Sequence, residues 1–282
     1  MICCARIRPA PILQTDKREV KNVVITGSTN GIGKALARNF LLQGDNVIIT
    51  SRKSSNVYAT YQEFIKMDGN KGECYPIIAD VSSYHDCELL VNRALHKMGH
   101  IDIWINNAGV STFEDFVSMH NEEIDDIVHT NLLGTMYCSN LIIPVFRTQL
   151  NKGVLINVEG AGSNGFATPN YSVYGSTKCA ITHFTKSLSI ENRAYKNVVF
   201  CTMSPGMVVT DLLLKNASKR MKEVFNIFCE TSDYIAEYLV SKINTVKRNE
   251  QIRYLTLNRI FVLLLLSTVR YNRHFDKHGN PK

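Results

Sequence analysis

Long apolar runs are missing from this sequence of 282 residues. No stretch approaches the ~20 consecutive apolar residues that a helix needs to cross a bilayer. The eight cysteines are scattered, include no CxxC pair and follow no secretory signal. We therefore expect no metal site and no disulfide framework. What remains is a soluble body with buried, reduced thiols.

Positive charge is scarce in the middle of the chain. The tails, residues 1–22 and 246–282, contribute +3 and +6 to a net charge of +7, which leaves −2 for residues 23–245. Nucleic-acid binding requires a basic face on the folded surface, so we expect no nucleic-acid partner. The basic tails are either solvated ends or contacts to an anionic membrane. The N-terminus, with two arginines and no acid before Asp16, faintly resembles a transit peptide.

Short β-rich runs alternate with helical patterns from about residue 22, which is typical of a parallel sheet covered by helices on both faces. The predicted strands are 22–26, 46–50, 74–79, 101–105, 154–158 and 198–203, and the predicted helices are 31–43, 84–98, 124–145 and 173–195. No linker or repeat interrupts them. We predict an α/β fold with a doubly wound, Rossmann-like parallel sheet in a single domain over 21–245. A basic tail (1–20) precedes it, and a basic, partly apolar and helical extension (246–282) follows.

A glycine-rich turn joins the first predicted strand to a helix. Glycines there allow a tight turn and a close approach to a pyrophosphate, and the helix N-terminus offers free N–H groups to it. Such a turn is a weak signal alone, but its place after the first strand indicates dinucleotide binding. The residues assigned to the cofactor are Gly27, Ser28, Thr29, Asn30, Gly31, Ile32 and Gly33.

The second predicted strand ends in Thr50-Ser51-Arg52-Lys53. An acid at this end would accept the 2′-hydroxyl of NAD, whereas a cation pairs with the 2′-phosphate of NADP. We expect NADPH, bound by Ser51 and by the planar guanidinium of Arg52. The alternative is that Arg52 and Lys53 are solvated loop charges.

Tyr174 and Lys178 stand four residues apart on one predicted helix, so both side chains lie on the same face. The ammonium of Lys178 is expected to lower the pKa of the Tyr174 phenol, whose ordinary value of about 10 is too high for acid–base exchange near neutral pH. Taken alone, the pair also suits an ordinary amphipathic helix.

Together these motifs resemble the short-chain dehydrogenase family over about residues 20–215. The turn is followed by Asn106-Asn107-Ala108-Gly109, by Asn131 and by Tyr174-Gly175-Ser176-Thr177-Lys178, in the family's order. The resemblance implies that Asn131 holds a water that relays protons from Lys178, although an Asn within a helix can also cap or kink it. The further cofactor contacts that it implies are Asp80, Val81, Asn107, Ala108, Gly109, Tyr174, Lys178, Pro205, Gly206, Val208 and Thr210.

The serine expected to hydrogen-bond the substrate oxygen departs from the family's pattern. Where many relatives have paired serines, the chain reads Glu159-Gly160-Ala161-Gly162-Ser163. Ser163 stands eleven residues before Tyr174, whereas thirteen is more usual. Ser172 and Ser176 are closer in sequence but lie on or beside the tyrosine's own helix. We assign the role to Ser163.

The segment NVEGAGSNGFATP followed by VYGSTKC resembles the chlorophyll(ide) b reductases of the non-yellow-coloring type. That resemblance implies NADPH-dependent reduction of the C7 formyl group of a lipophilic pigment, chlorophyll(ide) b, to hydroxymethyl. It also implies a homo-oligomer or a hetero-oligomer with a related reductase. The place would be the stromal side of the thylakoid membrane in the chloroplast of a photosynthetic host, and the cytoplasm otherwise.

Two other functions stay open. One is a general short-chain dehydrogenase acting on a lipid, retinoid or acyl carbonyl. The other is an NADP-binding scaffold, against which the intact Asn131, Tyr174 and Lys178 speak.

The apolar run from Ile260 to Leu266 lies between Arg259 and Arg270. Simpler short-chain dehydrogenases tend to end in a final strand, and the sequence shows no clear one here. The run is either a buried helix or part of a helix over 252–271 that contacts a membrane interface.

Overall fold

The computed structural model describes residues 18–210, 219–271 and 273–276. Their centre is a seven-stranded sheet, parallel throughout, in the order β3-β2-β1-β4-β5-β6-β7. The strands are β1 Asn22–Ile25, β2 Asn46–Ser51, β3 Cys74–Ile78, β4 Ile103–Asn106, β5 Gly153–Val158, β6 Val198–Ser204 and β7 Glu250–Arg253. The strand order reverses between β1 and β4, as expected for a doubly wound sheet.

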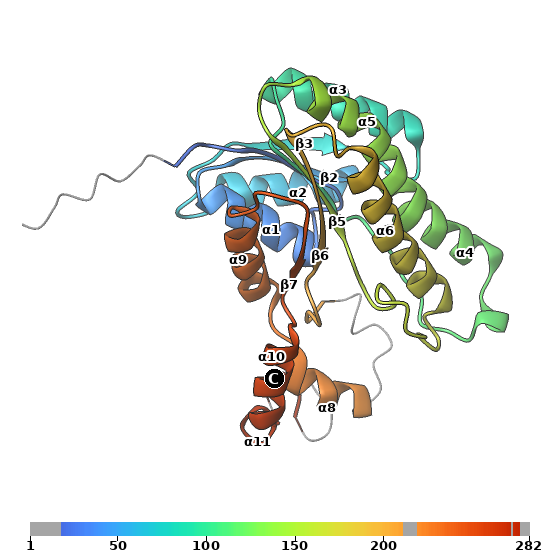
Figure 1. The fold of residues 1–282 in the computed structure, drawn as a ribbon. Helices are drawn as coiled ribbons and strands as arrows, with labels where there is room; N and C mark the ends of the chain where they lie inside the picture. Colours follow the sequence, from blue (N-terminus) through green and yellow to red (C-terminus); the bar gives the residue numbers. More distant parts are fainter. Residues whose placement is uncertain (1–17, 211–218, 272, 277–282) are drawn as a thin grey trace, which may run out of the picture.

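Helices cover both faces of the sheet (Figure 1). Helices α1 (Gly31–Leu42), α2 (Ser54–Ile65) and α9 (Ser232–Ile243) pack on one face. On the other face lie α3 (Tyr84–Met98), α5 (Gly134–Thr148) and α6 (Ser172–Glu191). The predicted fold class is therefore confirmed. None of the described helices is both long and apolar enough to span a membrane.

Alternation along the strands divides the core between these two faces. Val23 and Ile25 of β1 point toward α1, whereas Val24 points toward the other layer. Trp104 of β4 is fully buried on the side of α3 and α5. Strands buried on both faces need apolar side chains on both faces, which accounts for the short apolar runs within β1, β2, β4, β5 and β6.

Two predictions about element boundaries were wrong. The single helix expected over 124–145 is α4 (Asn121–Ile127), a π-helical turn η2 (Val128–Leu133) and α5. The chain also has a final strand, because β7 pairs in parallel with β6, so the sheet continues to Arg253. Helix α2 and the short 3₁₀ turn η1 (Phe116–Ser118) were not predicted.

The remaining helices form a C-terminal extension. Helices α10 (Leu257–Leu265) and α11 (Ser267–Arg270) pack against α8 (Lys219–Phe228) beyond the end of β7 (Figure 1). A small apolar cluster of Phe225, Cys229 and Phe275 joins them. The segment 252–271 is therefore not one helix, since it begins in β7 and is interrupted at Leu266.

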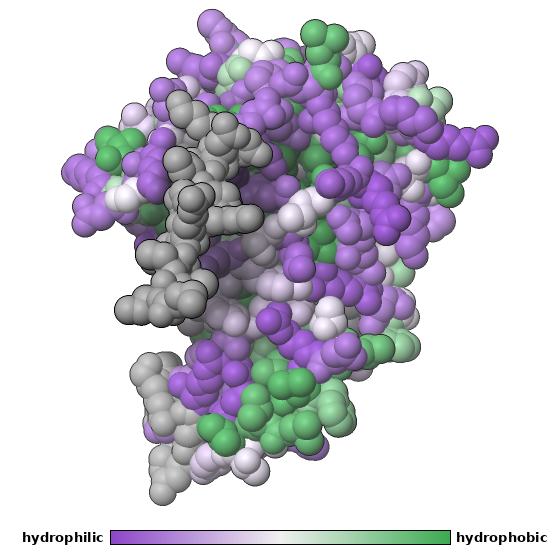
Figure 2. Space-filling model, turned by 60° about the vertical axis from the view of Figure 1, so that its left-hand side comes forward, coloured by the Kyte–Doolittle hydropathy of each residue, from purple (hydrophilic) through white to green (hydrophobic). Residues whose placement is uncertain are grey.

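Helix α10 is not a buried helix. Leu263 is 7% exposed, whereas Phe261, Leu264 and Leu265 are 62%, 50% and 67% exposed. Figure 2 shows hydrophobic residues gathered on the small lobe at the bottom of the molecule. The described part of the chain thus leaves an apolar surface on the extension, of a kind that often marks an interaction site.

The arginines near α10 are mostly engaged inside the extension. The Arg259 guanidinium lies 4.1 Å from the centre of the Tyr254 ring. Arg270 and Arg273 both pair with Glu230, the former at 2.8 Å. Arg253 is exposed. The basic C-terminal tail, expected to be either solvated or in contact with an anionic membrane, is therefore partly engaged in internal contacts.

Candidate active site

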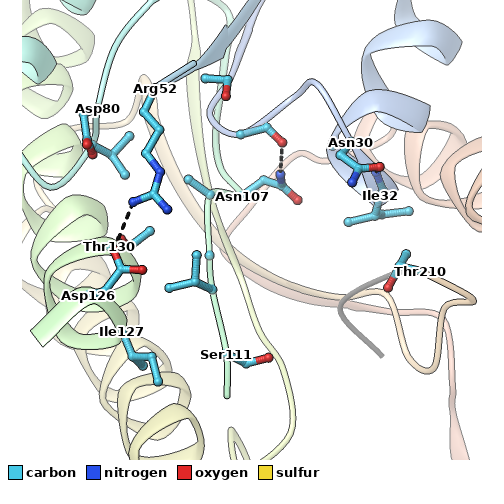
Figure 3. Close-up of a pocket in the computed structure, with 18 of the residues that line it drawn as sticks. Asn30, Ile32, Arg52, Asp80, Asn107, Ser111, Asp126, Ile127, Thr130 and Thr210 are labelled. Atoms are coloured by element: carbon cyan, nitrogen blue, oxygen red, sulfur yellow. Dashed lines mark hydrogen bonds and ion pairs between the residues drawn. The ribbon is translucent and has the colours of Figure 1, made fainter. Parts of the chain in front are cut away.

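A cavity of about 870 Å³ opens where the strand order reverses, the usual ligand site of an open α/β sheet. It is lined by the turn after β1, the end of β2, and the segments after β3 and β4 (Figure 3). The sequence-predicted residues that line it are Gly27, Asn30, Gly31, Ile32, Gly33, Ser51, Arg52, Asp80, Val81, Asn107, Ala108, Gly109 and Thr210. A cavity of this size suits a dinucleotide.

The turn after β1 has little room for side chains. Gly27 has φ +61°, and a Cβ atom there would lie 2.8 Å from the Cα atom of Ala108. The Thr26 hydroxyl accepts hydrogen bonds from the backbone N–H groups of Asn107 and Ala108, at 2.9 and 3.0 Å. The Asn30 side chain caps α1 by accepting from Gly31 N at 2.7 Å. The two turns are thus fixed as one surface beside the start of α1.

Several predicted cofactor residues lie away from the cavity lining. The Ser28 hydroxyl is buried, where it accepts from Thr50 N and donates to the Ile25 carbonyl. Gly206 packs against Leu255, and Val208 forms a β-bridge with Glu230. The others outside the lining are Thr29, Tyr174, Lys178 and Pro205.

Arg52 extends from the end of β2 into the cavity. Its guanidinium donates to Asp126 of α4 at 3.0 Å, and both side chains are partly exposed (Figure 3). Asp126 also accepts from Thr130. The acid that accompanies this cation therefore comes from 74 residues away in the sequence.

Tyr174 and Lys178 lie on α6, next to the cavity. The Lys178 nitrogen is 5.7 Å from the centre of the Tyr174 ring and donates to the Val158 carbonyl at 3.0 Å. Within the described part of the chain, the Tyr174 hydroxyl donates to and accepts from no other group. Tyr171 and Phe113 continue an aromatic row from Tyr174, with ring centres 5.8 and 4.9 Å apart.

Asn131 is fully buried in the π-helical turn η2. Its side chain accepts from Val110 N at 2.8 Å and donates to the Val110 carbonyl at 2.9 Å. A Cβ atom on Gly109 would lie 3.3 Å from the Asn131 oxygen and 3.7 Å from the Lys178 nitrogen. Asn131 and Lys178 thus approach the same point, beside a glycine that lines the cavity.

The electrostatics of the tyrosine–lysine pair differ from the expectation. Burial raises the pKa of Tyr174 to about 12, with a smaller contribution from Tyr171. Burial lowers the pKa of Lys178 to about 8, opposed by the charge of Glu159. Lys178 is not among the groups that shift the pKa of Tyr174, so the expectation that it lowers the phenol pKa is wrong for this structure, in which desolvation dominates. Tyr174 is protonated near neutral pH, which suits a proton donor.

Ser163 does not hydrogen-bond Tyr174 in the described structure. Its hydroxyl accepts from Gly160 N at 2.9 Å and donates to the Lys178 carbonyl at 3.3 Å. Gly160 is the residue against the tyrosine, since a Cβ atom there would lie 2.2 Å from the Tyr174 hydroxyl oxygen. The tyrosine hydroxyl thus occupies the space that a side chain at position 160 would need.

The site contains residues that the sequence did not identify. Glu159 is 3% exposed and accepts from Gln251 and Thr182. Further residues line the cavity from the loop after β4 and from the helices around η2: Val110, Ser111, Thr112, Glu123, Asp126, Ile127 and Thr130. The spacing of Tyr171 from Tyr174 could have indicated the aromatic row, but the other contacts depend on the folded chain.

Comparisons with known proteins agree with this geometry. Residues 21–221 match the family described as short chain dehydrogenase. The probable chlorophyll(ide) b reductase NYC1, chloroplastic, of Oryza sativa subsp. japonica is 43% identical over 92% of this chain and 54% of its own length. The chlorophyll(ide) b reductase NOL, chloroplastic, of the same species is 40% identical over 91% of this chain and 74% of its own length. The chain thus spans about half the length of the NYC1 proteins that it matches.

A solved structure shares the fold. A 3-ketoacyl-(acyl-carrier-protein) reductase from Brucella melitensis, complexed with NADH, superposes with a TM-score of 0.71 at 25% identity. The superposition covers 83% of this chain and 96% of that one.

Proposed function

The chain belongs to the short-chain dehydrogenase family, and on that premise we propose that it is an NADPH-dependent reductase of the C7 formyl group of chlorophyll(ide) b. The observation that carries the substrate is the 40–43% identity to chlorophyll(ide) b reductases over more than nine tenths of the chain. The product is the 7-hydroxymethyl pigment. A general carbonyl reductase would have the same site but a different substrate preference.

A nicotinamide cofactor fits the cavity. The glycine turn leaves the backbone bare beside the start of α1, whose free N–H groups favour a pyrophosphate. Arg52 supports the phosphorylated form of the cofactor, because its guanidinium reaches the cavity from the end of β2, and that end of the strand contains no acid of its own. The 2′-phosphate would compete with Asp126 for that guanidinium. Bound there, the cofactor supplies the hydride.

The chain's own residues supply position and the proton. Tyr174 donates its phenolic proton to the carbonyl oxygen as negative charge develops there. Lys178, held at the Val158 carbonyl, stabilises the resulting phenolate and binds the nicotinamide ribose. Asn131 positions a water that returns a proton through Lys178. Ser163 is the proposed donor to the substrate oxygen. To fill this role, its hydroxyl would have to give up its hydrogen bond to the Lys178 carbonyl and donate to the substrate instead.

The exposed face of α10 is the proposed route for a lipophilic pigment. Phe261, Leu264 and Leu265 present apolar surface, and the segment from 246 to 282 carries eight cations against two acids. Anionic lipid complements both features. This would place the protein at the surface of a membrane, and in a photosynthetic host at the stromal face of the thylakoid. We further propose that the protein forms a homo-oligomer or a hetero-oligomer with a related reductase.

One experiment tests the substrate directly. The protein is incubated anaerobically with NADPH and chlorophyllide b, retinal or an acyl carbonyl, and the products are separated by chromatography. We expect the 7-hydroxymethyl product to form with a kcat/KM well above that for the other carbonyls. Faster turnover of retinal or the acyl carbonyl would replace this function with general carbonyl reduction. Cofactor binding without any turnover would favour a scaffold.

A further inference from the structure

Glu159 is a buried carboxylate at the centre of the site that the proposed mechanism does not use. It follows β5 directly and is 3% exposed, and its N–H group donates to the Met203 carbonyl of β6. Gln251 of β7 donates to its two carboxylate oxygens at 2.7 and 2.9 Å. A buried carboxylate is costly without strong partners. Its position therefore requires an explanation beyond packing.

Lys178 is a positive charge that interacts with Glu159. Its ammonium is bonded to the carbonyl of Val158, the residue just before Glu159. Thr182, one turn further along α6, lies within hydrogen-bond distance of both the Glu159 carboxylate and the Lys178 carbonyl. The attraction of Glu159 opposes the lowering of the Lys178 pKa by burial.

Among the residues that the structure describes, no other charged group acts on Lys178 from the elements packed around it. Gly109, after β4, and Asn131, in η2, carry no charge. Tyr174, on the same helix, is neutral near pH 7, and burial raises its pKa further, to about 12. Glu159 is thus the one anion in the described part of the chain that acts directly on this lysine.

We infer that Glu159 is a positioning residue that keeps Lys178 charged at the Val158 carbonyl, and that Gln251 anchors it from the last strand. This inference deepens the proposed function, on which its kinetic consequence rests. Strand β7 would then contribute to the chemistry, because its Gln251 hydrogen-bonds the Glu159 carboxylate that keeps Lys178 charged. Gly160, the residue after Glu159, leaves room for the Tyr174 hydroxyl.

The charge of Lys178 can be titrated without any substrate. The protein is labelled with [¹³C]lysine, and the Lys178 NMR signal is identified by its loss in Lys178→Met. We expect a midpoint near 8 in the unmutated protein and a midpoint lower by roughly one pH unit or more in Glu159→Gln, which keeps the shape and removes the charge. Glu159→Asp keeps the negative charge, so its midpoint should lie close to that of the unmutated protein.

A matched control is Asp45→Asn, which neutralises another buried carboxylate that is paired with Arg18 away from the site. It should leave the Lys178 midpoint unchanged. A shift of less than about 0.3 units in Glu159→Gln, or an equal shift in Asp45→Asn, would overturn the inference. If Glu159→Gln does not fold, Gln251→Leu, which removes the anchor of the carboxylate, is titrated instead, and an unmoved midpoint in that variant would have the same meaning.

The pH profile of kcat for carbonyl reduction provides a second arm. In Glu159→Gln the fall of kcat at high pH should begin about one unit lower than in the unmutated protein, because Lys178 loses its proton earlier. A titration that shifts while no carbonyl is reduced would contradict the proposed function and leave the role of Glu159 intact. A reductase whose titration and profile are both unmoved would contradict only the inference.

Discussion

The sheet domain and the C-terminal extension treat apolar side chains in opposite ways. In the domain, Phe40, Phe64, Trp104 and Phe146 are fully buried. On α10, Phe261, Leu264 and Leu265 are more than half or half exposed. Each fully buried large side chain contributes about 1.5–3 kcal/mol to the free energy of folding. The exposed side chains on α10 do not make this full contribution.

This difference indicates that apolar residues have different roles in the two regions. The domain uses its apolar residues for stability, and at the site it also buries polar groups: Asn131, Glu159 and Lys178 are all less than 5% exposed. The extension leaves part of its apolar surface exposed in the described part of the chain, and we expect this surface to be a contact site. Changes at the site should therefore alter chemistry or stability, and changes on the open face of α10 should alter neither.

The largest effect is expected for Tyr174→Phe. Loss of the proton donor should lower kcat by roughly 10²–10⁴-fold, while the ring still packs and NADPH affinity stays within about twofold. Steady-state kinetics and fluorescence titration with NADPH measure the two quantities. Tyr171→Phe is the matched control, because it makes the same chemical change on the adjacent ring and should keep most activity. A Tyr174→Phe variant with near-normal kcat would refute the mechanism.

Regular alternation made the domain predictable. Six of its strands are apolar enough to be found from the sequence, and all six are confirmed. Strand β7 was missed because Glu250–Arg253 contains only one apolar residue, Ile252, and forms a strand through pairing with β6. Helix α2 was missed although Val57, Thr60 and Phe64 are buried at helical spacing.

The site was predictable in its residue types and not in its contacts. Motif order identified Tyr174, Lys178 and the glycine turn, and the structure brings Lys178 and Asn131 to one point. The pairing of Arg52 with Asp126 and of Glu159 with Gln251 joins residues 74 and 92 positions apart. Such contacts depend on the strand order and on how far each side chain reaches, which local patterns do not contain.

The second prediction concerns the cofactor. In Arg52→Ala the preference for NADPH over NADH should fall by roughly ten- to a hundredfold, since a charge-assisted contact to the 2′-phosphate contributes about 1.5–3 kcal/mol. Binding of both cofactors is measured by fluorescence titration. Lys53→Ala removes the neighbouring exposed cation and should have a much smaller effect. Equal affinities for the two cofactors in the unmutated protein would show that Arg52 does not select NADPH.

The third prediction tests whether the buried charge of Lys178 lowers the free energy of unfolding. Because the pKa of Lys178 is lowered to about 8 on folding, its charge is a cost below pH 8, and the cost disappears as the pH rises toward the unfolded value of about 10.4. Lys178→Met loses the hydrogen bond to Val158 but should still gain about 2 kcal/mol at pH 7. Urea unfolding at pH 7 and 10 measures this.

The gain for Lys178→Met should be smaller at pH 10 than at pH 7. Lys186→Met, at an exposed position of the same helix, should change stability by less than about 0.5 kcal/mol at both values. A Lys178→Met variant that is less stable than the unmutated protein at pH 7 would mean that the buried charge is fully compensated.

The smallest change in folding free energy is expected on the open face of α10. The double variant Leu264→Glu with Leu265→Glu places charge on exposed positions, so its thermal unfolding and NADPH binding should stay close to normal. Flotation with vesicles containing anionic lipid should be lost, because the apolar contact is removed and the new acids repel the lipid. Leu263→Glu is the matched control on the same helix. It should cost several kcal/mol, since Leu263 is 7% exposed and its replacement buries an unpaired charge.

Added salt should weaken flotation of the unmutated protein only in part, because Arg259, Arg270 and Arg273 are engaged internally and the apolar face carries most of the contact. If the unmutated protein does not float and light scattering finds a dimer that the double variant breaks, a second copy covers α10, and the exposed face is a subunit contact in place of a membrane one.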